Sequence, residues 1–167
     1  MPTPEFILAL RKKVGHDLLH VPTVAVVARN DAGEVLLVKD SETGVWGCPG
    51  GILEPNESPA DGAVRETWEE AGVLIELSAV LGVFGGEHCA GVYKNGDKLA
   101  WTAIVFSARA AAGSPRPDGS ETLGAQFFAG DQLEQLAIKD HSRMFLAAEV
   151  HAGKGAYFAP RTWRPPV

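Results

Sequence analysis

Three carboxylates and one arginine stand within a six-residue stretch, at Arg65, Glu66, Glu69 and Glu70. Steps of three and four residues bring side chains to one face of an α-helix, so the three carboxylates would share an arc of roughly 100°. Like charges at these spacings repel one another, so the cluster does not stabilise its own helix. Mg²⁺ and Mn²⁺ prefer oxygen ligands and commonly bind through carboxylates and substrate phosphates. The spacing therefore predicts a divalent-metal site on one helix face.

The residues around this cluster predict a helix over residues 58–71, directly behind a glycine-rich turn. Ser58 is a good N-cap, and Pro59 suits the first helical position. Asp61, three residues after the cap, can complete a capping box. Gly72 follows the last residue of the pattern, where a left-handed C-terminal cap is expected.

The side of this helix away from the acids is predicted to be buried. Its residues are Ala60, Val64, Thr67, Trp68 and Ala71. Gly62 lies among the acids, where the missing side chain would leave room for a ligand to approach the backbone.

The segment from Gly51 to Val73 resembles the signature of the Nudix hydrolases. That signature is a glycine, five residues, a glutamate, seven residues, and then Arg-Glu-apolar-x-Glu-Glu-x-Gly-apolar. Every charged and glycine position is filled, and Thr67, where the family usually has an aliphatic residue, is the one departure. The preceding turn from Trp46 to Gly51 also resembles the turn that leads into this signature.

The resemblance implies an α/β fold in which a mixed β-sheet is sandwiched between helices (α/β/α). It implies hydrolysis, by water attack at phosphorus, of the pyrophosphate linkage in a nucleoside diphosphate joined to another group, such as an NTP or a nucleotide sugar like ADP-ribose. The small nucleotide would be the partner, and Mg²⁺ (or Mn²⁺) the cofactor. The implied metal ligands are Glu66, Glu69, Glu70 and the carbonyl oxygen of Gly51. Glu57 and Arg65 would orient the metal-binding glutamates through hydrogen-bonded ion pairs.

The sequence offers two positions for the residue that activates water. Some family members use a glutamate of the signature, which would be Glu66 or Glu69 here. Others use a glutamate on a later loop, and Glu121 is the candidate because it lies just before the strand expected at residues 125–129. A non-catalytic Nudix domain that binds a nucleotide as a sensor or scaffold is the alternative. Such domains usually lose an acid of the signature, and none is lost here.

Three residues could contact the substrate. Trp46 could stack on a base or pack beside its Pro-Gly-Gly turn, and His88 lies in a glycine-rich loop near the expected mouth of the site. Phe84 could line a base-binding cleft or belong to the core. The substrate is left open, because the proline associated with ADP-ribose enzymes is absent at residues 87–89, which are Glu-His-Cys.

Composition limits the remaining possibilities. With 167 residues, 46% of them hydrophobic and 22% charged, the chain is expected to form one globular domain. The net charge of −6 argues against broad nucleic-acid binding. No apolar run approaches a membrane span and no signal peptide is recognised at the N-terminus, so neither a membrane nor a secreted location is expected. Two cysteines do not suggest a disulfide framework. A cytoplasmic protein is therefore expected.

The chain is predicted to consist of an N-terminal helical lead-in (1–20), a Nudix hydrolase domain (21–152) and a C-terminal tail packed on the domain (153–167). Helices are predicted over 4–14, 131–137 and 140–151, strands over 23–29, 34–39, 74–84, 99–108 and 125–129, and a loop over 111–123. The first helix and the tail could each cover the sheet or join two copies, which leaves a homodimer open.

Overall fold

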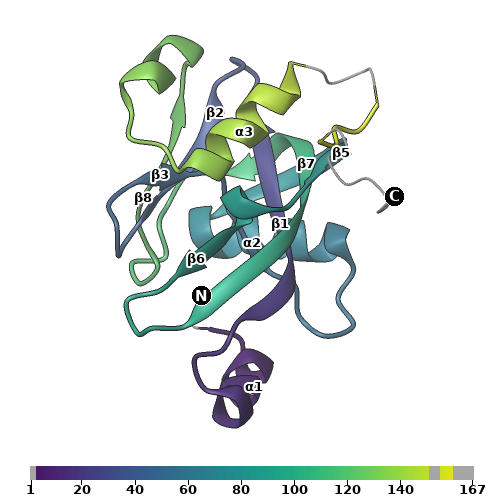
Figure 1. Ribbon diagram of the computed structural model, residues 1–167. Helices are drawn as coiled ribbons and strands as arrows, with labels where there is room; N and C mark the ends of the chain where they lie inside the picture. Colours follow the sequence, from purple (N-terminus) through teal and green to yellow (C-terminus); the bar gives the residue numbers. More distant parts are fainter. Residues whose placement is uncertain (1–2, 151–154, 160–167) are drawn as a thin grey trace.

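The central strand of the sheet is β1 (Leu19–Arg29), in a computed structural model that describes residues 3–150 and 155–159 (Figure 1). β1 pairs in parallel with β7 (Lys98–Gly113) along its whole length. Its other edge pairs antiparallel with β2 (Val35–Asp40) and β4 (Gly50–Ile52). An apolar run continuous along β1 suits a strand that is covered on both faces.

The outer strands complete one mixed sheet. β5 pairs with β7, β8 and β3 pair with β2, and β6 pairs with the beginning of β7. Their bounds are β3 (Trp46–Gly47), β5 (Val73–Phe84), β6 (Ala90–Val92) and β8 (Thr122–Phe128). The helices are α1 (Glu5–Val14), α2 (Pro59–Ala71) and α3 (Asp140–Glu149), with short 3₁₀ turns η1 (Glu87–Cys89) and η2 (Gly130–Gln135). Among the described helices, none has both the length and the apolar character needed to cross a membrane.

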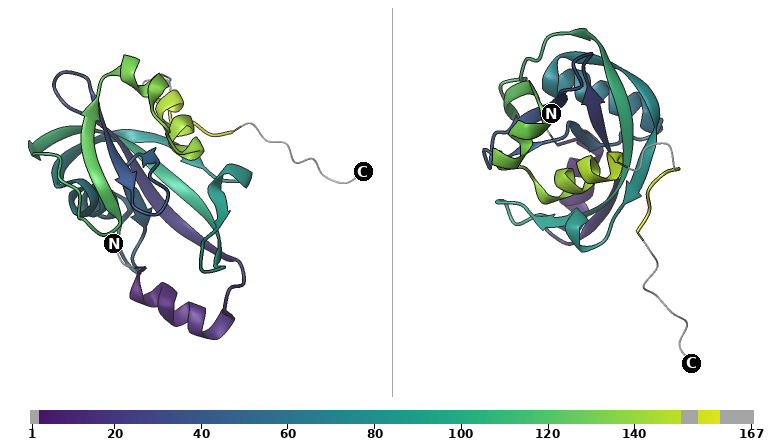
Figure 2. Two further views of the ribbon diagram at one scale, coloured as in Figure 1. Left: turned by 90° about the vertical axis from the view of Figure 1, so that its left-hand side faces the viewer. Right: turned by 90° about the horizontal axis from the view of Figure 1, so that it is seen from above.

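Helices cover both faces of the sheet, and the predicted α/β/α arrangement is confirmed. In Figure 1, α3 lies in front of the sheet and α2 behind it, and Figure 2 shows the same layers from two other sides. One core, between the sheet and α2, includes Val26, Leu36 and Ala63. A second core, on the α3 side, includes Val105 and Phe145.

α1 packs at one end of the sheet rather than on a face. Ile7 is buried against Val21 of β1 and Leu99 of β7. The guanidinium of Arg11 fastens the helix to the strand, because its Nη2 donates to the carbonyl oxygen of Lys98 at 2.8 Å. The lead-in helix is thus held by one small apolar cluster and one cation.

Several predicted elements differ from the structure. The strand predicted over 23–29 begins earlier, at Leu19, and the strand predicted over 125–129 begins at Thr122, inside the predicted loop. β7 continues to Gly113, because its last residues pair with Val73 and Leu74, so the loop predicted from residue 111 begins after the strand. The segment predicted as a helix over 131–137 is instead the 3₁₀ turn η2.

The packing side predicted for α2 is partly wrong. Thr67 and Ala71 are buried, but Ala60 is exposed and 51% of Trp68 is accessible to solvent. The helix is rotated so that Glu66 lies on the inner side with a 2% exposed fraction. Because the acidic face of α2 is turned toward the protein, the side chain of Trp68 is on the solvent side of the helix.

Gly62 serves packing rather than ligand approach, contrary to prediction. A Cβ at this position would lie 2.4 Å from Leu53 Cδ2 and 3.0 Å from Glu57 Oε2. The space beside its backbone is therefore filled by these two side chains.

The described part of the C-terminal tail, residues 155–159, lies along β5. Tyr157 N–H donates to the carbonyl oxygen of Leu81 at 2.8 Å, and Val83 N–H donates to the carbonyl oxygen of Tyr157 at 2.9 Å. The Tyr157 ring stacks on Phe84 with centroids 5.1 Å apart. Residues 153–154 and 160–167 of the predicted tail lie outside the described residues.

Candidate active site

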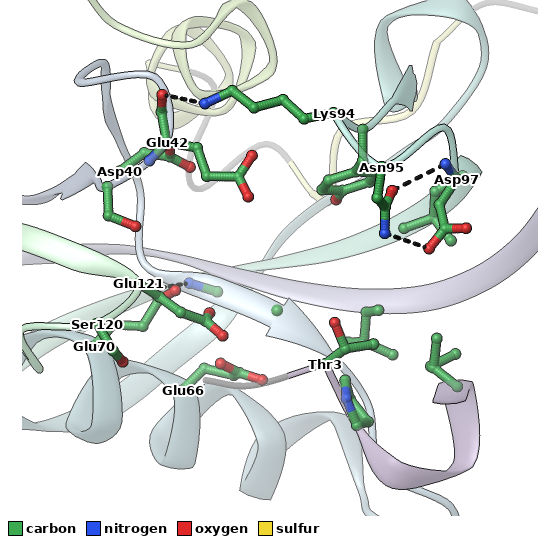
Figure 3. A pocket seen from close by; sticks show the side chains of 18 of the residues that line it. Thr3, Asp40, Glu42, Glu66, Glu70, Lys94, Asn95, Asp97, Ser120 and Glu121 are labelled. Atoms are coloured by element: carbon green, nitrogen blue, oxygen red, sulfur yellow. Dashed lines mark hydrogen bonds between the residues drawn. The ribbon is translucent and has the colours of Figure 1, made fainter. Parts of the chain in front are cut away.

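A cavity of about 560 Å³ opens beside the acidic face of α2. Its lining includes Glu66 and Glu70 from α2, Gly51 from β4, and Glu121 from the loop before β8. Figure 3 shows the side chains of Glu66 and Glu121 facing the same space. Segments distant in sequence therefore meet around a group of carboxylates.

The caps predicted for α2 fix the start and end of the helix that carries these acids. Ser58 Oγ accepts a hydrogen bond of 3.1 Å from Asp61 N–H, and Pro59 is the first helical residue. Gly72 ends the helix in the left-handed conformation, with φ of 66°. Glu66 and Glu70 are thereby held one turn apart on an ordered helix.

Two glycines let the turn before the helix lie against Glu66 and Glu70. A Cβ on Gly51 would be 2.5 Å from Glu66 Oε1, and a Cβ on Gly50 would be 2.2 Å from the carbonyl oxygen of Val24. Gly50 N–H donates to Glu70 Oε2 at 3.0 Å. The turn requires glycine for close contact with both β1 and the acids.

Burial makes the charged forms of these two acids costly. Desolvation raises the pKa of Glu66 to about 7, against the opposing influence of Arg65. Desolvation also raises the pKa of Glu70 to about 8, against the opposing hydrogen bond from Gly50, and the nearby Glu66 charge raises it further. One buried and one half-buried carboxylate, without enough compensating positive charge, are suited to a cation.

The donor set fits a hard divalent metal. Glu66, Glu70 and Gly51 line one cavity and offer oxygen atoms, and Mg²⁺ is commonly bound through one or two carboxylates with waters and substrate phosphates. Among residues 3–150 and 155–159, no group of three or more Asp, Glu, His or Cys side chains is close enough together to hold a metal ion without rearrangement.

Arg65 connects the signature glutamates. Its Nε and Nη2 donate to the two carboxylate oxygens of Glu57 at 2.6 and 2.7 Å, a bidentate pair. Its Nη1 donates to Glu66 Oε1 at 2.9 Å and to Glu69 Oε2 at 3.1 Å. Arg65 holds the pKa of Glu57 below its usual value, and Glu57 in turn raises the pKa of Arg65. Glu69 is therefore turned toward Arg65 and is not part of the cavity lining.

Asp118 organises the loop that carries Glu121. Its Oδ1 accepts backbone hydrogen bonds from Ser120, Glu121 and Thr122 at 2.9, 3.1 and 2.9 Å. These donors stabilise the carboxylate, so the pKa of Asp118 is held well below its usual range although burial opposes the shift. Burial raises the pKa of Glu121, and the Asp118 charge raises it further. Glu121 thus combines a raised proton affinity with a place on the cavity wall.

The three predicted substrate contacts are spread over different surroundings. Trp46 packs edge-on against Phe128, with ring centroids 4.8 Å apart, and lines neither this cavity nor the neighbouring one. Phe84 is 4% exposed and packs against Phe145 at 4.8 Å, so we assign it to the core instead. His88 is largely exposed and lines the neighbouring cavity.

Sequence reasoning missed the cations beside the acids. Lys139 Nζ lies 2.7 Å from Asp40 Oδ2, and Lys94 Nζ donates to the carbonyl oxygen of Glu42 at 3.0 Å. Both lysines line the cavity. They are far from the signature in sequence, and the only nearby signal was the Asn-Gly-Asp turn that follows Lys94.

Comparison with known proteins agrees with this geometry. Residues 19–148 match the model of the NUDIX domain family. The chain is 30% identical over 135 residues to a MutT-like protein from Streptomyces ambofaciens, covering 81% of this chain and 80% of that protein.

Solved structures show the same fold. A MutT NUDIX hydrolase from Burkholderia pseudomallei superposes with a TM-score of 0.63 at 28% identity, covering 78% of this chain and 98% of that chain. A NUDIX hydrolase from Nitrosomonas europaea gives a TM-score of 0.67 at 25% identity, covering 83% and 76% of the two chains. The chain therefore belongs to the Nudix family of MutT-like hydrolases.

Proposed function

We propose that this Nudix hydrolase uses Mg²⁺ or Mn²⁺ to cleave the pyrophosphate linkage of a nucleoside diphosphate joined to another group. The substrate would be an NTP, a nucleotide sugar such as ADP-ribose, or a similar small nucleotide. The observation that carries the proposal is that the buried Glu66 and the half-buried Glu70 line one cavity together with Gly51. The raised pKa values of both acids agree with a site suited to positive charge.

The proposed metal ligands are Glu66, Glu69, Glu70 and the carbonyl oxygen of Gly51. A divalent cation held by these residues would supply charge neutralisation at the pyrophosphate and a more acidic bound water. Support comes from the common cavity of Glu66, Glu70 and Gly51, and from the position of Glu69 on the same helix. Members of the Nudix family typically depend on a divalent metal, which agrees with this set.

Arg65 would keep these ligands in place. Its contacts to Glu57, Glu66 and Glu69 fix the direction of each carboxylate before a ligand arrives. The bidentate pair with Glu57 limits rotation of the guanidinium, which a lysine could not reproduce. Arg65 and Glu57 are thus proposed as positioning residues.

Glu121 is the proposed general base. It lines the same cavity as Glu66 and Glu70, and burial brings its pKa closer to neutrality than that of a solvated glutamate. A base on this loop would accept the proton of the attacking water and leave the signature acids free for the metal. The general base could instead be Glu66 or Glu69, and the kinetics of the Glu121→Gln variant distinguish these possibilities.

Chromatographic detection of the products tests the function, because cleavage yields a nucleoside monophosphate together with pyrophosphate or a second phosphomonoester. It would use NTPs, oxidised NTPs, ADP-ribose, other nucleotide sugars, NADH and dinucleoside polyphosphates, each with Mg²⁺ and with Mn²⁺. The blank is Glu70→Gln, and the matched control is Glu76→Gln, which alters an exposed glutamate of β5. We expect one substrate class to turn over well above the rest, in wild type and control but not in the blank. Nucleotide binding without turnover of any substrate would instead favour the non-catalytic sensor.

A further inference from the structure

A second cavity, of about 640 Å³, lies directly beside the carboxylate cavity. The two share part of their walls, formed by Asp40, Glu42, Tyr93, Lys94 and Lys139. A ligand longer than a pyrophosphate could therefore extend from one cavity into the other.

The second cavity is the one with aromatic walls. Trp101 from β7, Tyr93 from the turn after β6, His88 from η1 and His141 from α3 all contribute rings. In the carboxylate cavity, Tyr93 is the only aromatic residue among the described lining residues. Flat side chains of this kind are stacking partners for a heterocyclic base.

His141 adds a polar edge to these rings. Its imidazole meets Trp101 edge-on, with centroids 5.7 Å apart, and also lies 5.7 Å from the Phe145 ring. Burial, with a smaller effect from Lys139, lowers the pKa of His141 to about 4, against the opposing charge of Asp140. The ring is therefore neutral at physiological pH and carries one donor and one acceptor nitrogen, which suits the edge of an uncharged base.

The two lysines stand where the cavities join. Lys139 is held by Asp40 and Lys94 by the carbonyl oxygen of Glu42, so both ammonium groups are already placed along the shared wall. Lysine commonly binds phosphate as a point charge. Asp40 and Glu42 lie on the same wall, so the lysines offer two local ammonium groups and not a net positive field. A phosphate between a base bound in the second cavity and the carboxylates would pass these two groups.

We propose that the second cavity binds the base of the nucleotide among its ring side chains, with Lys94 and Lys139 on the adjoining phosphate. These ring side chains are Tyr93, Trp101, His88 and His141. This assignment rests on the proposed function, since it places the scissile pyrophosphate beside Glu66 and Glu70. The same arrangement makes the second cavity the place where nucleotide identity is read.

The test compares two kinds of non-hydrolysable probe, with and without a nucleoside. The α,β-methylene analogues of ADP and GDP carry a base, and methylenediphosphonate carries only the two phosphorus groups. Their affinities are measured by isothermal titration calorimetry with Mg²⁺ for wild type, Tyr93→Ala and His88→Ala. These two side chains are 49% and 57% exposed, so their removal spares the core. Phe158→Ala is the matched control, because Phe158 is 76% exposed and lines neither cavity.

We expect wild type to bind at least one nucleotide analogue more tightly than methylenediphosphonate. Tyr93→Ala should weaken that nucleotide analogue by about fivefold or more, the loss expected for one base–aromatic contact. Methylenediphosphonate should bind this variant within twofold of wild type, and Phe158→Ala should change neither affinity. Lys139→Gln should weaken both probes, since it acts on phosphate.

Two results would overturn the assignment. One is equal affinity of the wild-type protein for the nucleotide analogues and methylenediphosphonate. The other is nucleotide affinity that is unchanged in both Tyr93→Ala and His88→Ala. Because the measurement needs no turnover, an inactive protein that still shows the contrast between probes would contradict the proposed hydrolysis and not the base site. An active enzyme without the contrast would contradict only the base site.

Discussion

The hydroxyl of Thr122 lies 2.9 Å from the carbonyl oxygen of Glu70, joining residues 52 positions apart in the chain. The same hydroxyl is 3.0 Å from Asp118 Oδ1, and Thr122 is 2% exposed. The loop that carries Glu121 is thus anchored on the last turn of the helix that carries the signature acids. The distance from Glu121 to Glu70 is set by this buried contact and not by the loop alone.

Replacing Thr122 tests that anchor. Thr122→Val keeps the shape and removes the hydroxyl, leaving buried polar partners unsatisfied. We expect the free energy of unfolding to fall by about 1–3 kcal/mol and kcat to fall with it, while Mg²⁺ affinity is retained. Denaturant titration and steady-state kinetics measure both. Ser114→Ala, which changes an exposed serine that lines neither cavity, is the control. Lost stability with an unchanged kcat would show that the anchor does not position Glu121.

Glu121→Gln separates the two candidate bases. If Glu121 accepts the proton of water, kcat should fall by about 10²–10⁴-fold, while the affinity for Mn²⁺, followed by electron paramagnetic resonance, stays within a few fold of wild type. If the turnover number of Glu121→Gln equals that of wild type, the general base must be assigned to Glu66 or Glu69 instead.

Metal and pH act on the same buried acids, so their effects on stability are linked. The pKa of Glu70 is raised from its ordinary value of 4.5 to about 8 in the folded protein. Between these values the folded state binds more protons than the unfolded state, so without metal the stability contributed by Glu70 is lost as pH rises from 4.5 through 8. Glu66 acts in the same direction. Bound Mg²⁺ should oppose this loss.

Thermal unfolding from pH 5 to pH 9, with EDTA and with Mg²⁺, measures the linkage. We expect Mg²⁺ to raise Tm more at pH 8 than at pH 5. Glu70→Gln should show a flatter pH dependence in EDTA, a smaller Mg²⁺ effect and little activity. A variant with the wild-type response to Mg²⁺ and near-normal turnover would remove Glu70 from the metal site.

Gly51→Ala should damage the site without touching a charged residue. The new methyl group would lie 2.5 Å from Oε1 of the buried Glu66, so the carboxylate must move. We expect Mg²⁺ affinity to fall by about tenfold or more and activity to fall further. Gly130→Ala, where a Cβ meets nothing within 4 Å, is the matched control. Normal metal affinity in Gly51→Ala would contradict the proposed closeness of the turn and the acid.

Arg65→Lys keeps the charge but removes the bidentate contact with Glu57. Loss of such an orienting group typically costs about 10–100-fold in metal affinity. We expect that loss for Mg²⁺, measured by calorimetry, together with a lower kcat. Arg109→Lys, which alters an exposed arginine paired with the exposed Glu76, should change neither quantity. Equal metal affinity in both variants would mean that Arg65 does not orient the ligands.

Local signals explain why much of the fold could be predicted. The caps of α2 involve residues three or four apart, and the apolar runs of β1 and β2 are continuous in sequence, so each is readable without tertiary information. The solvent exposure of Trp68 could not be predicted from such local signals. Periodicity defines two sides of a helix, but an acidic side also faces the protein when it lines a cavity, as Glu66 does here.

The same distinction applies to the site. The signature acids could be found because they lie within one helix and the turn before it. Lys139 and Thr122 could not, since their roles depend on contacts with Asp40 and Glu70 that only the folded sheet creates. Phe84 was open between cleft and core, and its packing against Phe145 comes from a helix much later in the chain.

The position of α1 ties the shape of the carboxylate cavity to the packing of a helix outside the Nudix signature. Thr3, Pro4, Ile7 and Arg11 form part of the wall of that cavity. Ile7 is buried against Val21 and Leu99, and Arg11 donates to the carbonyl oxygen of Lys98. A substitution that loosens α1 from these partners would therefore reshape the cavity without touching any of the signature acids.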